Sequence, residues 1–236
     1  MRISFNQTIG ARRLFALGWT PSMFVRDCWK PHSEAEIFDL MEGNPWALLV
    51  SNGAEDSSGK IGGPFATNLP LILARERRLL TGHIARANAH AAALLRDNSP
   101  VLAIFQGPSS YVTASWYPGR DMPSTVYYTA VHCYGSLRFQ DEKLLRSALE
   151  ELTRLYETPI PNGWQTREIP ESEITRRLPA ILGFDFTIER IEAKFKLGQD
   201  EPPRDALAVA ERLLASANPQ DRLVGEMTRR YNEKRI

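Results

Sequence analysis

The sequence feature that most constrains the fold is a series of strand-type segments joined by short polar connections. Between residues 44 and 139, segments rich in β-branched, aromatic and aliphatic residues alternate with turns containing Gly, Pro, Asn or Ser. Parallel strands need crossover connections of about a dozen residues or more, usually helices. Few such helices fit here, so we expect mostly antiparallel strands. The chain is predicted to be mainly β with peripheral helices (α+β), a barrel and not a doubly wound sheet.

Seven strands are expected. They lie at residues 44–51, 64–73, 77–85, 100–107, 110–117, 124–139 and 184–197. Pro70 predicts an edge strand or a bulge, because proline has no N–H to donate to a neighbouring strand. Gly135 predicts a bend, and a slip in the apolar alternation at residues 189–190 predicts a bulge.

Helical periodicity replaces strand alternation after residue 140. Residues 141–158 place their apolar side chains on one stripe behind an N-cap at Asp141, which predicts an amphipathic helix. Further helices are expected at 33–41, where Ser33 is the N-cap, at 170–182 with an interruption at Pro179, and at 203–217 and 219–233.

These elements divide the chain into three parts. Residues 1–22 are interpreted as an N-terminal extension that is poorly ordered or precedes a functional start at Met23. The other two parts are a barrel domain at 23–200, with inserted helices at 141–182, and a C-terminal helical extension at 201–236.

Composition argues against several classes of protein. The net charge is +1 among 236 residues, so the chain as a whole is not attracted electrostatically to nucleic acid or anionic membranes. No apolar run approaches the roughly 20 residues that span a membrane. Cys28 and Cys133 do not form a zinc ribbon or a disulfide framework, and we expect two reduced, packed thiols in a cytoplasmic protein.

Motifs for common cofactors are absent or incomplete. The segment GAEDSSGKI at residues 53–61 has the wrong glycine spacing for a P-loop, and Ile61 stands where a magnesium-binding Ser or Thr is needed. No G-x-G-x-x-G, H-E-x-x-H or G-x-S-x-G motif occurs, and no segment has the pattern of a helix-turn-helix. A nucleic-acid partner is therefore not expected.

The segment LLTGHIARANAH at residues 79–90 is the strongest candidate for a binding site. A strand here places Thr81 and His83 on one face, and Asn88 is a good N-cap for the alanine-rich helix that follows. Arg86 then lies in the connection, beside the positive end of a helix, where a phosphate or carboxylate would bind. The alternative is a surface arginine, a core histidine at 83 and a helix-face histidine at 90.

Other polar and aromatic residues allow two interpretations. His132 shares a strand face with Ala130 and Tyr134, so a hydrogen-bonded core histidine is expected. Trp116 and Tyr117 would stack on an aromatic ligand or simply pack in the core. Lys196 alternates away from Phe195 and Leu197, toward solvent or a bound anion.

From Met23 to about Val209, the chain resembles the PaiB-type FMN-binding split-barrel proteins, which are labelled negative transcriptional regulators. The stretches that carry the resemblance are ATNLPL (66–71), GHIARAN (82–88), VLAIFQGP (101–108), YVTASWYP (111–118), TAVHCYG (129–135) and KFKLGQD (194–200). The resemblance implies a six-stranded split β-barrel, a homodimer with ligand sites at the subunit interface, and FMN. The cofactor-binding residues that it implies are His83, Arg86, Asn88, Trp116, Tyr117, Lys196 and Gln199.

The sequence departs from the family pattern at several polar and aromatic positions. Asn68 and Ser109 replace histidines, Phe195 and Gly198 replace Trp and Ser, and residues 124–128 replace a P-T-W-N-Y motif. These departures keep a second cofactor open.

A related branch, the piperazate synthases, uses haem and joins two nitrogens of an N-hydroxylated amino acid. MFVRDCWKP (23–31) and LLVSNG (48–53) are similar to that branch. His83 would then be the metal ligand of haem b. The first hypothesis is thus a flavin-dependent redox or regulatory protein acting on a small molecule. The others are a haem enzyme and a non-catalytic transcriptional regulator.

Overall fold

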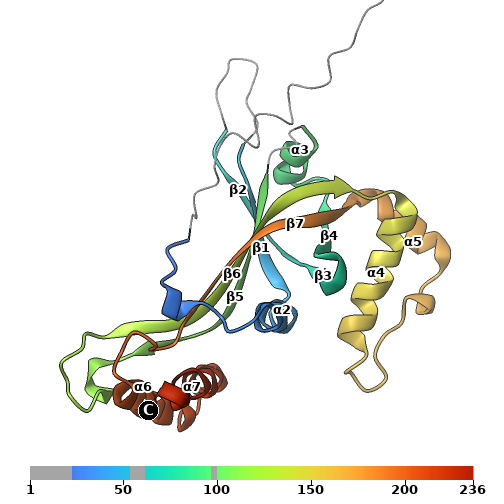
Figure 1. The fold of residues 1–236 in the computed structure, drawn as a ribbon. Coiled ribbons are helices and arrows are strands. Elements are labelled where there is room, and N and C mark those ends of the chain that lie inside the picture. Colours follow the sequence, from blue (N-terminus) through green and yellow to red (C-terminus); the bar gives the residue numbers. More distant parts are fainter. Residues whose placement is uncertain (1–22, 54–61, 97–99, 236) are drawn as a thin grey trace, which may run out of the picture.

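The computed structural model describes residues 23–53, 62–96 and 100–235, and the prediction for residues 1–22 lies outside these ranges (Figure 1). The described strands are β1 (Trp46–Ser51), β2 (Phe65–Pro70), β3 (Ile72–Ala74), β4 (Leu79–Ala85), β5 (Val101–Val112), β6 (Thr125–Phe139) and β7 (Ile181–Lys196). They form one sheet in the order β2-β1-β5-β6-β7-β4-β3, and each neighbouring pair is antiparallel. The predicted antiparallel arrangement is confirmed.

The sheet closes on itself at Leu71. β2 and β3 stand at opposite ends of the strand order, yet only this residue separates them in the chain. Leu71 is 1% exposed, and its N–H donates to the Pro45 carbonyl at 2.9 Å. One bent strand therefore joins both edges, and the result is the six-stranded split β-barrel that the resemblance implies. The break after Pro70 agrees with the irregularity expected there.

Two predicted strands are one strand in the structure. Residues 100–107 and 110–117 were expected as separate strands, but β5 runs through residues 101–112 with a register shift between Gln106 and Ser109. Gly107 lies in this bulge, and a Cβ there would overlap the Thr129 hydroxyl. Gly107 and Pro108, which separate the two expected strands, lie within this bulge and do not reverse the chain.

The other predicted irregularities are confirmed. The pairing of β6 with β7 shifts register between Tyr134 and Gly135, opposite the stretch from Ile188 to Arg190. β7 begins at Ile181, earlier than expected, because Pro179 stands in a short 3-10 turn that ends the preceding helix.

The described helices follow the expected pattern closely. They are α2 (Glu34–Gly43), α3 (Ala89–Arg96), α4 (Glu142–Glu157), α5 (Glu171–Arg177), α6 (Pro203–Leu214) and α7 (Pro219–Asn232). The Ser33 hydroxyl accepts from the Glu36 N–H at 3.3 Å, and the Asp141 carboxylate accepts from the Leu144 N–H at 2.9 Å, so both predicted N-caps are confirmed. Short 3-10 turns occupy 27–29, 75–77, 114–116, 166–168, 178–180 and 233–235. No helix in the described ranges is long and apolar enough to cross a membrane.

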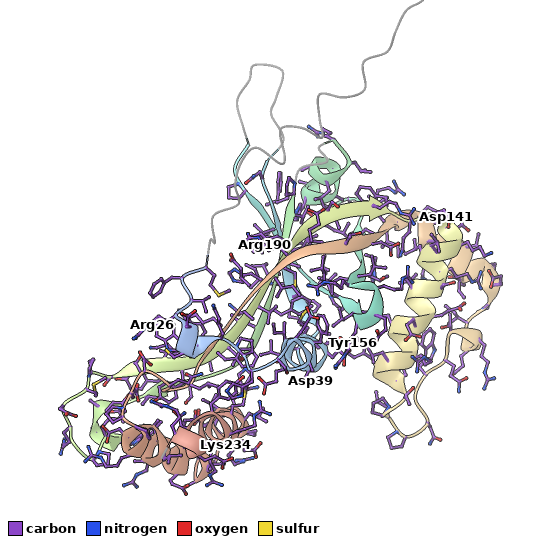
Figure 2. All side chains as sticks on the ribbon, in the orientation of Figure 1. Arg26, Asp39, Asp141, Tyr156, Arg190 and Lys234 are labelled. Carbon is purple, nitrogen blue, oxygen red and sulfur yellow. The ribbon has the colours of Figure 1, made fainter. Side chains whose placement is uncertain are left out.

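The helices α4 to α7 lie at the two ends of the sheet (Figure 1). α4 and α5 are inserted between β6 and β7 and extend from one end of the sheet, with Asp141 at the start of α4 and Tyr156 near its other end (Figures 1 and 2). α6 and α7 pack beside the β5–β6 hairpin at the opposite end. Val209 and Val224 from these helices are fully buried in the same core cluster as the barrel. The division of the chain near residue 200 stays a prediction.

Strand alternation decides which residues face the barrel interior. Its largest fully buried side chains include Leu49, Leu80, Phe105, Phe184, Phe186 and Phe195. In β4, Leu80, Gly82 and Ile84 face inward, whereas Thr81 and His83 are half-buried on the outer face, as predicted.

Two predictions about single residues are wrong. His132 was expected in the core, but it is half-buried on the outer face while its neighbours Val131 and Cys133 are fully buried. Cys28 was expected to be packed and is exposed, because it lies in a 3-10 turn on the surface.

Candidate functional site

The connection between β4 and α3 is a tight turn with Arg86 and Ala87 at its centre. The Asn88 N–H closes the turn by donating to the Ala85 carbonyl at 3.0 Å. α3 begins at Ala89, so the two central residues stand directly before a helix N-terminus. The helix dipole and the positive charge of Arg86 make this a favourable place for an anion.

Arg86 is exposed and fixed at its base. Its backbone N–H donates to the Ala180 carbonyl at 2.8 Å, and its Nε donates to the Pro179 carbonyl at 2.9 Å. In the described part of the chain, the two terminal amino groups of Arg86 form no hydrogen bond. The guanidinium is thus oriented by the chain and keeps donors for a ligand.

His83 lies on the outer face of β4, opposite Gly183 of β7. A Cβ on Gly183 would contact Leu145 of α4 at 2.8 Å, so α4 covers this part of the sheet. Burial lowers the pKa of His83, which favours the neutral imidazole. A neutral imidazole can hydrogen-bond a cofactor or bind iron, although no group of three metal-binding side chains occurs in the described residues.

Asn88 is the N-cap of α3, as predicted. Its Oδ1 accepts from the His90 N–H at 2.9 Å, and its Nδ2 donates to Thr67 Oγ1 at 3.3 Å. Both polar ends of the side chain are therefore used inside the protein. Asn88 shapes the turn, and Arg86 is the residue of the turn whose polar end remains exposed.

His90 is the residue of this corner that sequence reasoning missed. It was assigned at most to a helix face, but it is 1% exposed, and its ring nitrogens lie within hydrogen-bond distance of Ser51 and Thr67. The alanines on either side of His90 could have indicated its burial, because small side chains let this helix pack closely against the barrel. Its two partners are far away in sequence and gave no signal.

Gly82 does not open space for a ligand ring. A Cβ at this position would meet the Leu71 side chain at 2.7 Å and the Pro70 carbonyl at 3.2 Å. What this glycine allows is the close approach of the bend between β2 and β3. The glycine is needed for barrel closure.

The aromatic pair at 116–117 lies at the opposite end of the molecule, after β5. Trp116 is half-buried and packs against the core. Tyr117 is 1% exposed, and its hydroxyl donates to Glu201 Oε1 at 3.0 Å, while the Tyr127 hydroxyl donates to the other oxygen. Glu201 is 5% exposed, and burial is the main cause that raises its pKa. Of the two predicted aromatics, Tyr117 belongs to the interior.

Lys196 and Gln199 also lie at this end of the molecule. Gln199 is 8% exposed, and it closes the turn after β7 by accepting from the Leu197 N–H at 2.7 Å and donating to the Phe195 carbonyl at 2.6 Å. Lys196 is half-buried, and its ammonium donates to the Thr125 hydroxyl. Lys196 therefore stays near the surface, whereas Gln199 is a structural residue of the turn.

The structure separates the seven predicted residues into two groups. The first group, at the β4–α3 corner, lies beside α3, and the second lies beside α6 at the far end of the β5–β6 hairpin (Figure 1). One chain does not bring the two groups to a single ligand. We call them the corner group (His83, Arg86 and Asn88) and the hairpin-end group (Trp116, Tyr117, Lys196 and Gln199).

The corner group fits a flavin phosphate by the chemistry of its donors. A guanidinium beside a helix N-terminus suits a phosphate, and the half-buried neutral His83 adds a hydrogen-bonding side chain. Among the described strands β2 pairs with β1 alone, so its other edge presents backbone N–H and C=O groups to this part of the structure, with Asn68 exposed between them. Such an edge can pair with the alternating donors and acceptors of a flavin ring.

Comparison with known proteins identifies relatives in sequence. Residues 23–190 match the profile of a family described as "Putative FMN-binding domain". The protease synthase and sporulation protein PAI 2 of Bacillus subtilis (strain 168) is 28% identical over 216 residues, which cover 91% of this chain and 100% of that protein. An uncharacterized protein of Emericella nidulans is 31% identical over 72% of this chain and 82% of its own length.

Solved structures share the fold at low sequence identity. The conserved hypothetical protein Rv2991 from Mycobacterium tuberculosis aligns with a TM-score of 0.53 and 14% identity, covering 76% of this chain and 94% of that protein. The flavocytochrome Anf3 from Azotobacter vinelandii aligns with a TM-score of 0.50 and 13% identity, covering 71% and 69%. Both comparisons agree with the split-barrel architecture.

Proposed function

This chain belongs to the family of FMN-binding domains, and from that premise we propose that it uses bound FMN in a redox or regulatory role on a small molecule. The observation that carries the proposal is the exposed Arg86 guanidinium, which its Nε bond to Pro179 orients beside the start of α3. In the proposed site, Arg86 binds the phosphate and the free edge of β2 faces the ring.

We propose further that the site is completed in a homodimer. The corner group and the hairpin-end group lie far apart in one chain, but both would reach one ligand if each came from a different subunit (Figure 1). The outer face of the sheet supports a protein partner because large apolar side chains remain exposed on it. Trp46 is 65% exposed, Tyr111 63% and Val126 45%, and Leu48, Leu102 and Ile104 are half-buried.

Within this site the residues of the chain have separate tasks. Bound FMN would supply one- and two-electron transfer, which no protein side chain provides. Arg86 fixes the phosphate end, and neutral His83 can donate or accept one hydrogen bond at the outer face of β4. Lys196 would place a positive charge at the same ligand from the second subunit. Both cysteines are free thiols, which supports a reducing compartment such as the cytoplasm.

The absorption spectrum of the purified protein, before and after incubation with FMN, tests the proposal. We expect the double band of a bound flavin and a Kd for FMN that rises about 10- to 100-fold in Arg86→Ala, since a charge-assisted hydrogen bond contributes about 1.5–3 kcal/mol. A Soret band that His83→Ala abolishes would replace FMN by haem b. A DNA shift that weakens steeply with salt would instead support the transcriptional role.

A further inference from the structure

A buried polar network connects the start of α3 to the β1–β2 hairpin. The His90 ring nitrogens lie 3.0 Å from Ser51 Oγ and 2.8 Å from Thr67 Oγ1. The ring also stacks on Phe65, with centroids 5.4 Å apart and an interplanar angle of 14°. His90 is 1% exposed and Ser51 is 6% exposed, so water has little access to the Ser51–His90 contact, whereas Thr67 is half-buried. The imidazole is held at two edges and one face.

The network is complete when the imidazole is neutral. A neutral ring has one donor and one acceptor nitrogen, and each hydroxyl can both donate and accept, so either tautomer satisfies both contacts. In the described part of the chain, burial alone shifts the pKa of His90, and it lowers that pKa. His90 therefore acts here as a fixed hydrogen-bonding group and not as a charge.

Thr67 links the His90 ring to the turn that contains Arg86. Its hydroxyl contacts the His90 ring and also accepts from Asn88 Nδ2 at 3.3 Å. Asn88 in turn caps the His90 N–H through Oδ1 and closes the turn through its own backbone N–H to Ala85. The three side chains form a closed circuit, and Arg86 stands in the turn that this circuit fixes.

The Ser51–His90 contact has the spacing of a nucleophile and its base, but its surroundings favour another role. Ser51 is buried, and its hydroxyl also lies within 3.2 Å of the Asn52 carbonyl. A nucleophile must reach a substrate, whereas these atoms face the interior. The pair is better explained as part of the support beneath the turn.

We propose that His90, acting through Thr67 and Asn88, is the positioning residue for the phosphate at Arg86, and that it thereby sets the preference of this protein for FMN over unphosphorylated riboflavin. This inference rests on the flavin site proposed above. A guanidinium that swings by about an ångström loses the directed hydrogen bonds to a phosphate but has little effect on the ring. The network should therefore affect the two flavins unequally.

The experiment compares the affinities of FMN and riboflavin by quenching of flavin fluorescence. Thr67→Val keeps the β-branched shape in β2 and removes the hydroxyl, and His90→Leu removes both ring nitrogens. In each variant we expect the ratio of FMN to riboflavin affinity to fall about tenfold, with riboflavin affinity within about twofold of wild type. Ser51→Ala, one contact further from Asn88, should change the ratio less.

Two further variants separate a positioning role from general destabilisation. Leu95→Ala alters an exposed side chain of the same helix outside the network and should leave the ratio unchanged. His90→Gln restores one donor and one acceptor, and it should recover part of the preference that His90→Leu loses.

The outcomes also separate this inference from the proposed site. If Arg86→Ala abolishes the preference for FMN but Thr67→Val leaves it unchanged, the role of His90 is overturned and the phosphate site stands. Equal losses of affinity for both flavins in Thr67→Val would also overturn it. If the wild-type protein shows no preference between the two flavins, the phosphate site itself is wrong.

Discussion

The corner group and the hairpin-end group were both expected to bind a cofactor, yet their polar atoms are used differently. At the corner, internal hydrogen bonds hold Asn88 and the base of Arg86, and the end of the guanidinium remains exposed. At the hairpin end, most of the polar side-chain atoms are buried and hydrogen-bonded inside the protein. Tyr117 and Tyr127 both donate to Glu201, and Gln199 binds backbone groups. Only Lys196 and part of Trp116 stay near the surface there.

This difference shows that a family motif can combine residues of two kinds. Some touch a ligand, and others build the support on which ligand-binding residues stand. Burial separates the two kinds, since a side chain with 1% exposure and a satisfied hydroxyl, such as Tyr117, has no donor left for a ligand. The corner thus combines an exposed guanidinium with a buried support, whereas the polar atoms of the hairpin-end group are mostly used inside the protein.

The largest expected effect tests the supporting role of the hairpin end. Gly198 has a φ of +82°, and a Cβ there would overlap the Tyr127 hydroxyl that binds Glu201. Gly198→Ala should lower the free energy of unfolding by about 2–3 kcal/mol, from backbone strain and overpacking. Urea unfolding measures this loss.

The control is Gly43→Ala at the end of α2, where a Cβ meets nothing within 4 Å. This variant should be neutral or slightly stabilising, since alanine has the higher helix propensity. If both substitutions cost the same, the turn after β7 is not the rigid support described here.

Much of the fold was predictable because it depends on local patterns. These patterns involve residues that are close in sequence, as in strand alternation, the N-caps at Ser33 and Asp141 and the bend at Gly135. Barrel closure at Leu71 and the merging of two expected strands into β5 were not predictable, because they depend on which distant strands pair. A sequence does not show whether a glycine and proline turn the chain or form a bulge.

The candidate site was predictable only in part, for a similar reason. Arg86 and Asn88 were found from the strand-to-helix corner, which is local. His90 was missed because its partners Ser51 and Thr67 come from two strands that only the barrel brings together. Glu201 gave no signal at all, since a charged residue after a glycine-containing turn is usually exposed.

A mixing experiment sharpens the comparison by asking whether the two groups meet across subunits. We expect Arg86→Ala and Lys196→Ala each to weaken FMN binding, the second by about tenfold. In a dimer that carries one substitution per subunit, one composite site holds both substitutions and the other holds neither. Unfolding and refolding the two variants together should therefore restore wild-type affinity at about a quarter of the sites, as random pairing of subunits requires.

The control for this experiment is refolding each variant alone, which should restore nothing. Titration with FMN counts the tight sites. If the mixture also contains none, the two groups do not share a ligand, and the corner binds flavin without the hairpin end.

The smallest expected effect concerns Glu201 and the pH dependence of stability. Burial raises its pKa above the value of 4.5 that it has in the unfolded chain. Below pH 4.5 both states hold the proton, but above it the unfolded chain ionises first, so folding loses free energy until the folded carboxyl also ionises. The stability of the wild type relative to Glu201→Gln should therefore fall as the pH rises from 4.5 and level off above the folded pKa. Urea unfolding of both proteins from pH 4 to 8 measures this difference, with Glu226→Gln as the matched substitution at an exposed carboxyl group. A difference that grows with pH would mean that the two tyrosine hydroxyls outweigh burial, and the hairpin end would then hold a stabilised charge.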